Sequence, residues 1–114
     1  MIYRRKRYKV KPKIVTEFNQ HFNHTLLPTQ LKYGARLVGR WMSQEKENEV
    51  EIMAIWEYDS MEEYEKIEQK VRSDQAHVAR VQGWYEKMGG RENLKDVFLK
   101  IEQDFLESTV TSVY

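Results

Sequence analysis

The chain has 114 residues, enough for one domain with its own core, and a net charge of +1 at pH 7. It contains no cysteine, which excludes disulfides, thiolate catalysis and cysteine-based zinc sites. No apolar run approaches the roughly 20 residues of a membrane helix, and arginines follow Met1-Ile2-Tyr3 directly, so no secretory signal is indicated and we expect a cytoplasmic protein without membrane contact.

The N-terminal third predicts a strand and a helix. Residues 2–10, IYRRKRYKV, alternate apolar with basic side chains, as a strand does. Pro12 suits the first turn of a helix, because the missing N–H of proline needs no partner there. Pro28 should break or kink this helix, and Gly34 should close its last turn. The buried stripe of the helix is expected to contain Ile14, Val15, Phe18, Phe22 and Leu26.

Two apolar runs, residues 36–42 and 50–58, flank a highly charged tip, which predicts a β-hairpin. One parity of the runs is apolar and should pack under the helices: Leu37, Trp41, Val50, Ile52, Ala54 and Trp56. The other parity mixes apolar and charged side chains and should face outward: Arg36, Val38, Arg40, Met42, Met53 and Ile55.

The hairpin leads into predicted helices. Ser60 precedes Glu63 by three positions, a capping box that predicts a helix in the stretch DSMEEYEKIEQKVRSD, residues 59–74. Apolar residues at helical spacing predict a further helix over residues 74–88, which the glycine pair at 89–90 should end.

The last part of the chain completes the expected fold. Residues 91–103 again show helical spacing, and residues 105–114, rich in threonine and valine, predict a fourth strand. The order is then β-α-β-β-α-β with an extra C-terminal helical segment. This is an α+β, ferredoxin-like fold in a single domain of residues 1–114, with an antiparallel sheet covered by helices on one face.

The uncovered face of such a sheet invites a partner, and we expect a homodimer. Apolar residues at its centre, namely Val38, Met42, Met53 and Ile55, would be unusual on a monomer. Charges buried there need partners, so we expect arginine–carboxylate pairs within or between the copies. The charged residues concerned are Arg5, Arg7, Arg36, Arg40, Glu51 and Glu57.

The hairpin and its flanks carry family motifs. Pro28 and Gly34 precede the strand sequence LVGRW, an Asn-Glu pair lies at positions 48–49, and WEYDS at 56–60 leads into the next helix. These motifs resemble those of the NIPSNAP family. The resemblance implies that two copies close their sheets into one dimeric α+β barrel, with any ligand in a cavity between sheet and helices. It implies little about chemistry, because the function of that family is poorly defined.

Four aromatic residues are candidates to line a ligand pocket: Trp41, Trp56, Tyr58 and Tyr64. Large aromatic side chains also fill cores, so we expect most of them in the core and one or two at a cavity. The expected ligand is a small hydrophobic or aromatic molecule, and catalysis without a metal or an organic cofactor stays open. A structural or protein-interaction module without a ligand is the alternative.

Histidines raise two cofactor questions. Glu17, His21 and His24 share one side of the first helix, but Glu17 and His24 lie ~10 Å apart along its axis, too far to bind one ion together with His21. We therefore expect no metal. His77 is kept as a ligand-binding candidate, because haem-degrading monooxygenases of the same superfamily bind haem through a histidine in a similar late helix.

Haem itself is not expected. The resemblance to those monooxygenases also calls for an asparagine on the first strand and a tryptophan in the second helix. The first strand here has no asparagine, and the tryptophan position falls near Ile67 or Lys70. A capping or core role for His77 is the favoured interpretation.

Nucleic acid is a rival partner, since the first 13 residues hold seven basic residues and no acidic one. RNA-recognition domains also share the expected order of strands and helices. The third strand, however, begins with the acidic sequence NEVEI where those domains have basic residues. We expect the basic arm to meet carboxylates of the body or solvent, and no nucleic-acid partner.

Overall fold

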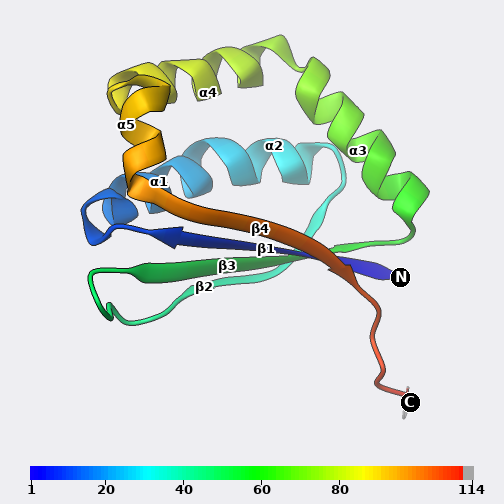
Figure 1. Ribbon diagram of the computed structural model, residues 1–114. Coiled ribbons are helices and arrows are strands. Elements are labelled where there is room, and N and C mark those ends of the chain that lie inside the picture. The colour runs from blue at the N-terminus through cyan, green and yellow to red at the C-terminus, as the bar shows by residue number, and fades with distance from the viewer. Residues whose placement is uncertain (112–114) are drawn as a thin grey trace.

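The computed structural model describes residues 1–111, which form a four-stranded antiparallel sheet with helices on one side (Figure 1). The strands are β1 (Ile2–Val10), β2 (Arg36–Met42), β3 (Val50–Tyr58) and β4 (Phe98–Leu106), in the order β2-β3-β1-β4 across the sheet. The expected α+β, ferredoxin-like arrangement is confirmed.

The first helical segment lies against the sheet and runs without a break through Pro28. It consists of η1 (Pro12–Ile14), α1 (Val15–His21), η2 (Phe22–Leu26) and α2 (Leu27–Lys32). The η2 segment is π-helical, and the N–H of Leu27 bonds to the carbonyl of Phe22. Such a widened turn accommodates a residue without an N–H donor. The break expected at Pro28 does not occur, and the irregularity there is the π-helical turn that directly precedes α2.

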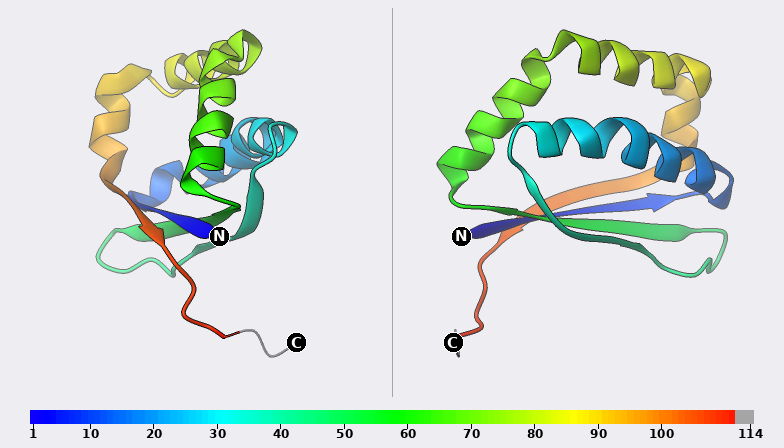
Figure 2. Two further views of the ribbon diagram at one scale, coloured as in Figure 1. Left: turned by 90° about the vertical axis from the view of Figure 1, so that its right-hand side faces the viewer. Right: turned by 180° about the vertical axis from the view of Figure 1, so that it is seen from behind.

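Three further helices form an arch over this segment (Figures 1 and 2). The first, α3 (Met61–Ser73), rises from the end of β3; α4 (Gln75–Lys87) crosses above; and α5 (Gly90–Val97) descends to β4. Ser60 caps α3 through a 3.1 Å bond from the N–H of Glu63, as the capping box predicts. Gly89 and Gly90 have φ of 94° and 82°, which permits the sharp turn into α5.

The start of β4 corrects two predictions. Helix α5 ends at Val97, so residues 91–103 are not helical throughout, and the fourth strand covers 98–106 rather than 105–114. Residues 112–114 lie outside the described part. The strand begins at residue 98 because it pairs with β1, where Arg5 lies opposite Asp104 and Arg7 opposite Glu102. Cross-strand contacts of this kind outweigh the local helical spacing.

A bulge in β2 changes which side chains face the helices. Leu37 lies opposite Trp56, but Gly39 lies opposite Ile55, so Val38 is an extra residue in the strand. A one-residue shift moves every following side chain to the other face of the sheet.

Three predicted orientations in β2 are therefore wrong. Arg40 and Met42 lie on the side covered by helices, whereas Trp41 lies opposite Met53 on the uncovered side and is 51% exposed. The indole of Trp41 lies across Gly39, where an added Cβ would come too close to the ring. A glycine at position 39 lets the ring lie flat on the strand.

The sheet thus has two distinct faces. The helix face, under the helices, includes Arg4, Lys6, Tyr8, Arg40 and Ala54; the open face includes Arg5, Arg7, Trp41, Met53 and Ile55. Buried apolar side chains form two clusters on the helix face, one around Val10, Phe18 and Ile52 and one around Phe22, Trp56 and Tyr58. No helix within residues 1–111 is long and apolar enough to cross a membrane.

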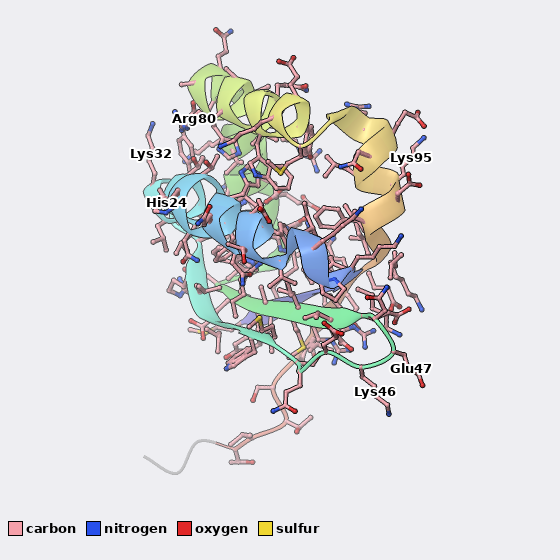
Figure 3. All side chains as sticks on the ribbon, turned by 90° about the vertical axis from the view of Figure 1, so that its left-hand side faces the viewer. His24, Lys32, Lys46, Glu47, Arg80 and Lys95 are labelled. Atoms are coloured by element: carbon pink, nitrogen blue, oxygen red, sulfur yellow. The ribbon has the colours of Figure 1, made fainter. Side chains whose placement is uncertain are left out.

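The tip of the β2–β3 hairpin forms a tight turn. Glu47 and Asn48 both have positive φ, and residues 46 and 49 exchange two backbone hydrogen bonds of 3.0 Å, as in a tight hairpin turn. Lys46 and Glu47 point away from the body of the molecule (Figure 3). The residues of the tip line neither of the cavities described next.

Candidate functional site

A cavity of about 530 Å³ lies between the helix face of β1 and β4 and the arch of α4 and α5. We call it the main cavity. Residues of α4 and α5 line it on one side, and residues of α1 and η2 line it on another. Its walls are mostly aromatic and aliphatic: Tyr8, Phe18, Leu26, Val81, Trp84, Tyr85, Leu94, Phe98 and Ile101. This is the concave, mainly apolar environment in which proteins bind small molecules.

The aromatic wall is held by specific ring contacts. Phe18 packs edge-to-face against Tyr8 and Phe98, with ring centroids 5.0 and 4.9 Å apart. His21 stacks on Trp84 with centroids 4.2 Å apart and planes 8° from parallel. These five side chains come from β1, α1, α4 and β4, so the wall forms where the arch packs over the sheet.

His21 contributes a neutral polar group to this wall. Its side chain is buried, with 6% exposed. Burial lowers the pKa of His21 to about 4, and the nearby His77 adds to the effect. At neutral pH the imidazole is therefore uncharged, and it can accept or donate a hydrogen bond.

Cations also line the main cavity, and no carboxylate of residues 1–111 does. Lys6 lies on the floor, with its ammonium group 5.4 Å from the ring centroid of Tyr8. Arg91 and Lys95 belong to α5, and the Lys95 side chain is largely exposed (Figure 3). The charge at the cavity wall is thus positive.

A smaller space of about 130 Å³ adjoins the main cavity, and we call it the inner cavity. Both are lined by Lys6, Tyr8, Phe18 and Leu26. The inner cavity is also lined by Arg4, Phe22, Gln30, Arg40, Ala54, Trp56 and Glu68.

Arg40 reaches the inner cavity because of the bulge in β2. Its guanidinium lies 4.3 Å from the ring centroid of Phe22 and 5.0 Å from that of Phe18. It donates a 2.6 Å hydrogen bond to the amide oxygen of Asn19. Burial lowers the pKa of Arg40, although an arginine stays charged at any physiological pH.

Three of the predicted site residues surround Arg4. Its guanidinium lies 5.9 Å from the rings of Trp56 and Tyr58 and 5.1 Å from that of Tyr64. Arg4 is 5% exposed and lies 3.5 Å from the carboxylate of Glu68. Burial raises the pKa of Tyr58 to about 12, so the phenol stays protonated. Of the three aromatic residues, Trp56 lines the inner cavity, and the other two pack beside it.

The structure separates the other two predicted site residues from this group. Trp41 lies on the open face, and His77 is buried at the start of α4 and lines neither cavity. The N–H of His77 donates to the capping carboxylate of Asp74, and burial, with a smaller effect of Arg80, lowers the pKa of its imidazole. The ligand-binding roles of Trp41 and His77 stay predictions.

No group of three or more metal-binding side chains occurs within residues 1–111. His24 is exposed and lines neither cavity, whereas His21 is buried and lines the main cavity. The two histidines considered for a metal site therefore do not converge.

Of the residues that line the cavities, sequence reasoning named only Trp56 as a site residue, although signals for others were present. Arg4 and Lys6 share the parity of Tyr8 and Val10, so two cations stand on the inward side of β1. Charged residues at an inward parity indicate a buried polar site. Trp84 carries no such signal beyond its residue type.

Comparison with known proteins identifies a family whose sequences this chain matches. The family model described as NIPSNAP matches residues 3–94. No match was found among curated proteins.

Solved structures share the fold at low sequence identity. An uncharacterized NIPSNAP-like domain protein from Burkholderia xenovorans is 19% identical, with a TM-score of 0.70 over 97% of this chain and 87% of that one. A NIPSNAP family protein with unknown function from Agrobacterium tumefaciens is 18% identical, with a TM-score of 0.71 over 99% and 92% of the two chains.

A cofactor-independent oxygenase from Streptomyces nogalater has the same fold at 13% identity, with a TM-score of 0.55 over 99% of this chain and 97% of that one. At these identities the structural likeness establishes the fold alone. The family model matches most of the chain, including nearly all of β1, the hairpin, the helices from α1 to α4 and the first part of α5. The chain therefore belongs to the NIPSNAP family.

Proposed function

We propose that this chain binds a small molecule with an apolar or aromatic body in the main cavity. The observation that carries the proposal is the aromatic wall around a space of about 530 Å³. This volume lies within the range of about 300 to 1,000 Å³ that small-molecule pockets have. A module that only met other proteins would not need an aromatic-lined space of this size under its helices.

A calorimetric titration with the neutral aromatic amide 2-naphthamide tests the proposal. Saturable heat is expected from the native chain. Ile101→Trp should weaken binding, because Ile101 lines the cavity and is 58% exposed, so a larger ring fits there and occupies space. Leu99→Trp is the matched control, since Leu99 lies on the same strand and does not line the cavity.

Native mass spectrometry of the purified protein is the second arm of this test. A consistent co-purified mass would support ligand binding and would identify the natural molecule. Absence of both heat and bound mass would overturn the proposal and would favour the structural or protein-interaction alternative.

Catalysis without a metal or an organic cofactor is a second candidate function. It is favoured by the neutral imidazole of His21 in the cavity wall, which can accept a proton from a bound molecule. The oxygenase from Streptomyces nogalater, described as cofactor-independent, shares the fold. Conversion of the co-purified molecule under air, lost in His21→Phe with binding retained, would support catalysis; an unchanged molecule would contradict it. Haem chemistry at His77 is not proposed, because His77 lines neither cavity.

We also propose that two copies pair through their open faces. Trp41, Met53 and Ile55 lie next to one another there, and Trp41 and Val38 are 51% and 53% exposed. Apolar surface of this kind marks an interaction site. Sedimentation at micromolar concentration should give a mass near twice 13.8 kDa, and a monomer would contradict the proposal.

A cytoplasmic location and the lack of a nucleic-acid partner stay predictions. Fractionation of cells that express the tagged chain would check the location. A titration with single-stranded RNA at low salt, where phosphate attraction is strongest, should show no binding.

A further inference from the structure

We infer that the inner cavity is an anion site, and that the bound molecule is an amphipathic anion with a small acidic group, such as a carboxylate, on an apolar or aromatic body. The inference rests on the proposed function, because the two cavities adjoin and would hold two ends of one molecule. The body occupies the main cavity, and the acidic group occupies the inner one.

The geometry starts from one row of the sheet. Lys6 of β1 and Arg40 of β2 both lie opposite Ala54 of β3. Strands are spaced about 4.8 Å apart, so the two cationic residues flank the small methyl group at a backbone separation of roughly 10 Å. A larger side chain at position 54 would fill this place, whereas alanine leaves a hollow between two cations.

The charges around the hollow are not balanced. Arg4, Lys6 and Arg40 line the inner cavity, and among residues 1–111 Glu68 is the one carboxylate that lines it. Glu68 already lies 3.5 Å from Arg4 and accepts a 3.1 Å hydrogen bond from Gln30. Within residues 1–111, neither Lys6 nor Arg40 has a carboxylate within 4.0 Å. The inner cavity therefore has a positive charge that a ligand can neutralise.

Hydrogen-bond donors in the same place lack acceptors. The Nε of Arg4 and the Nη2 of Arg40 are buried and have no partner within the described part of the chain. Buried donors are normally paired, so such atoms need an explanation. A carboxylate accepts several hydrogen bonds and brings the missing charge, whereas a neutral group brings only acceptors.

The volumes of the two cavities indicate which end of the molecule each one holds. The inner cavity, about 130 Å³, is much smaller than the main cavity, about 530 Å³, so we assign the small acidic group to the inner cavity and the larger body to the main one. The aromatic wall of the main cavity, which begins at the shared residues Tyr8 and Phe18, suits the remainder.

Two probes with the same ring test the inference, namely 2-naphthoate and 2-naphthamide, titrated by calorimetry against the native chain. Hydrogen bonds to charged groups favour the anion by about tenfold or more. In Lys6→Gln the ratio of the affinity for 2-naphthoate to that for 2-naphthamide should fall by about tenfold. Lys9→Gln is the matched control, because Lys9 lies on the same strand, is exposed and faces away from both cavities, and its preference should match the native chain.

A second variant should change the affinity for 2-naphthoate in the opposite direction. Glu68→Gln removes the one carboxylate and should raise the affinity for 2-naphthoate more than that for 2-naphthamide. Equal affinity of the native chain for both probes would overturn the inference and leave the proposed function in place. Binding of neither probe would instead count against the proposed function. An anion preference that Lys6→Gln leaves intact would also overturn the inference, since the acidic group would then lie elsewhere.

Discussion

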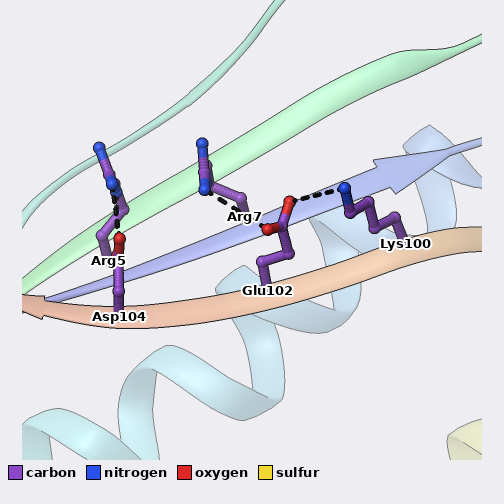
Figure 4. Close-up of polar contacts among 5 residues, drawn as sticks. All are labelled: Arg5, Arg7, Lys100, Glu102 and Asp104. Carbon is purple, nitrogen blue, oxygen red and sulfur yellow. Dashed lines mark hydrogen bonds and ion pairs between the residues drawn. The ribbon is translucent and has the colours of Figure 1, made fainter.

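The two faces of β1 carry similar cations in different electrostatic surroundings. On the open face, Arg5 donates two hydrogen bonds of 3.0 and 2.6 Å to Asp104, and Arg7 lies 3.6 Å from Glu102 (Figure 4). On the helix face, Arg4 shares one carboxylate with its neighbours, and Lys6 has none within 4.0 Å in residues 1–111.

This difference shows what each face is suited to meet. Acidic residues of β4 lie in register with the arginines of β1, so the open face is neutralised within one copy and can meet an identical surface. The helix face keeps a positive charge beside an aromatic cavity, which suits an anionic ligand rather than another protein surface. Four predictions test this difference between the two faces.

The largest expected effect comes from breaking the buried pair on the helix face. Glu68→Leu should lower the free energy of unfolding by about 3 to 5 kcal/mol, because it leaves Arg4 buried without a carboxylate. The double variant Arg4→Met/Glu68→Leu should lose clearly less. Urea denaturation measures both. A double variant as unstable as the sum of the single ones would mean that the pair is not energetically coupled.

The pH dependence of the free energy of unfolding tests whether protonation of the buried His21 destabilises the fold. The pKa of His21 is lowered from 6.5 to about 4, so between these values the unfolded chain binds the proton more readily than the folded one. Stability from neutral His21 is therefore complete above pH 6.5 and is lost as the pH falls toward 4, by about 3 kcal/mol in total. His77, whose pKa is also lowered, acts in the same direction. His21→Phe should flatten this slope in urea denaturation, and an unchanged slope would contradict the assignment.

The open face is tested by placing a charge at its apolar centre. Ile55→Glu should weaken the dimer by at least about 2 kcal/mol, near thirtyfold in dissociation constant, because the carboxylate would be buried without a partner. Val78→Glu is the control, since Val78 lies on α4, away from the sheet, and is 40% exposed. Sedimentation across a concentration series measures both. Equal masses for the two variants would remove Ile55 from the interface.

Much of the fold was predictable because its signals are local. Alternation in residues 2–10 and 50–58, the capping box at Ser60 and the glycine pair at 89–90 each act over a few residues, and each element formed as expected. The start of β4 was not predictable in this way. Pairing of residues 98–106 with β1 depends on partners about 95 residues away in the sequence.

The candidate site was less predictable, because one residue in β2 changes it. Strict alternation from Leu37 places Trp41 under the helices and Arg40 outside, whereas the bulge at Val38 exchanges them. The aromatic residues expected to line a pocket are therefore split between the two faces. The cavity is also lined by α4 and α5, whose position depends on the arch as a whole.

The smallest expected effect comes from the ion pairs of the open face. Asp104→Asn should change the urea midpoint only slightly, and less at high salt, because Arg5 and Asp104 are 30% and 42% exposed in the single chain. The hydrogen bonds from Arg5 lower the pKa of Asp104, so this contribution is present above the ordinary carboxyl pKa and is lost in acid. If two copies cover the open face, the same change leaves Arg5 buried and unpaired, and dimer dissociation should respond more strongly than unfolding does. The paired replacement Arg5→Leu/Asp104→Leu should then be better tolerated than Asp104→Asn. Equal and small effects on dissociation from the single and double changes would place these charges in solvent, and the neutral open face would then have no role in assembly.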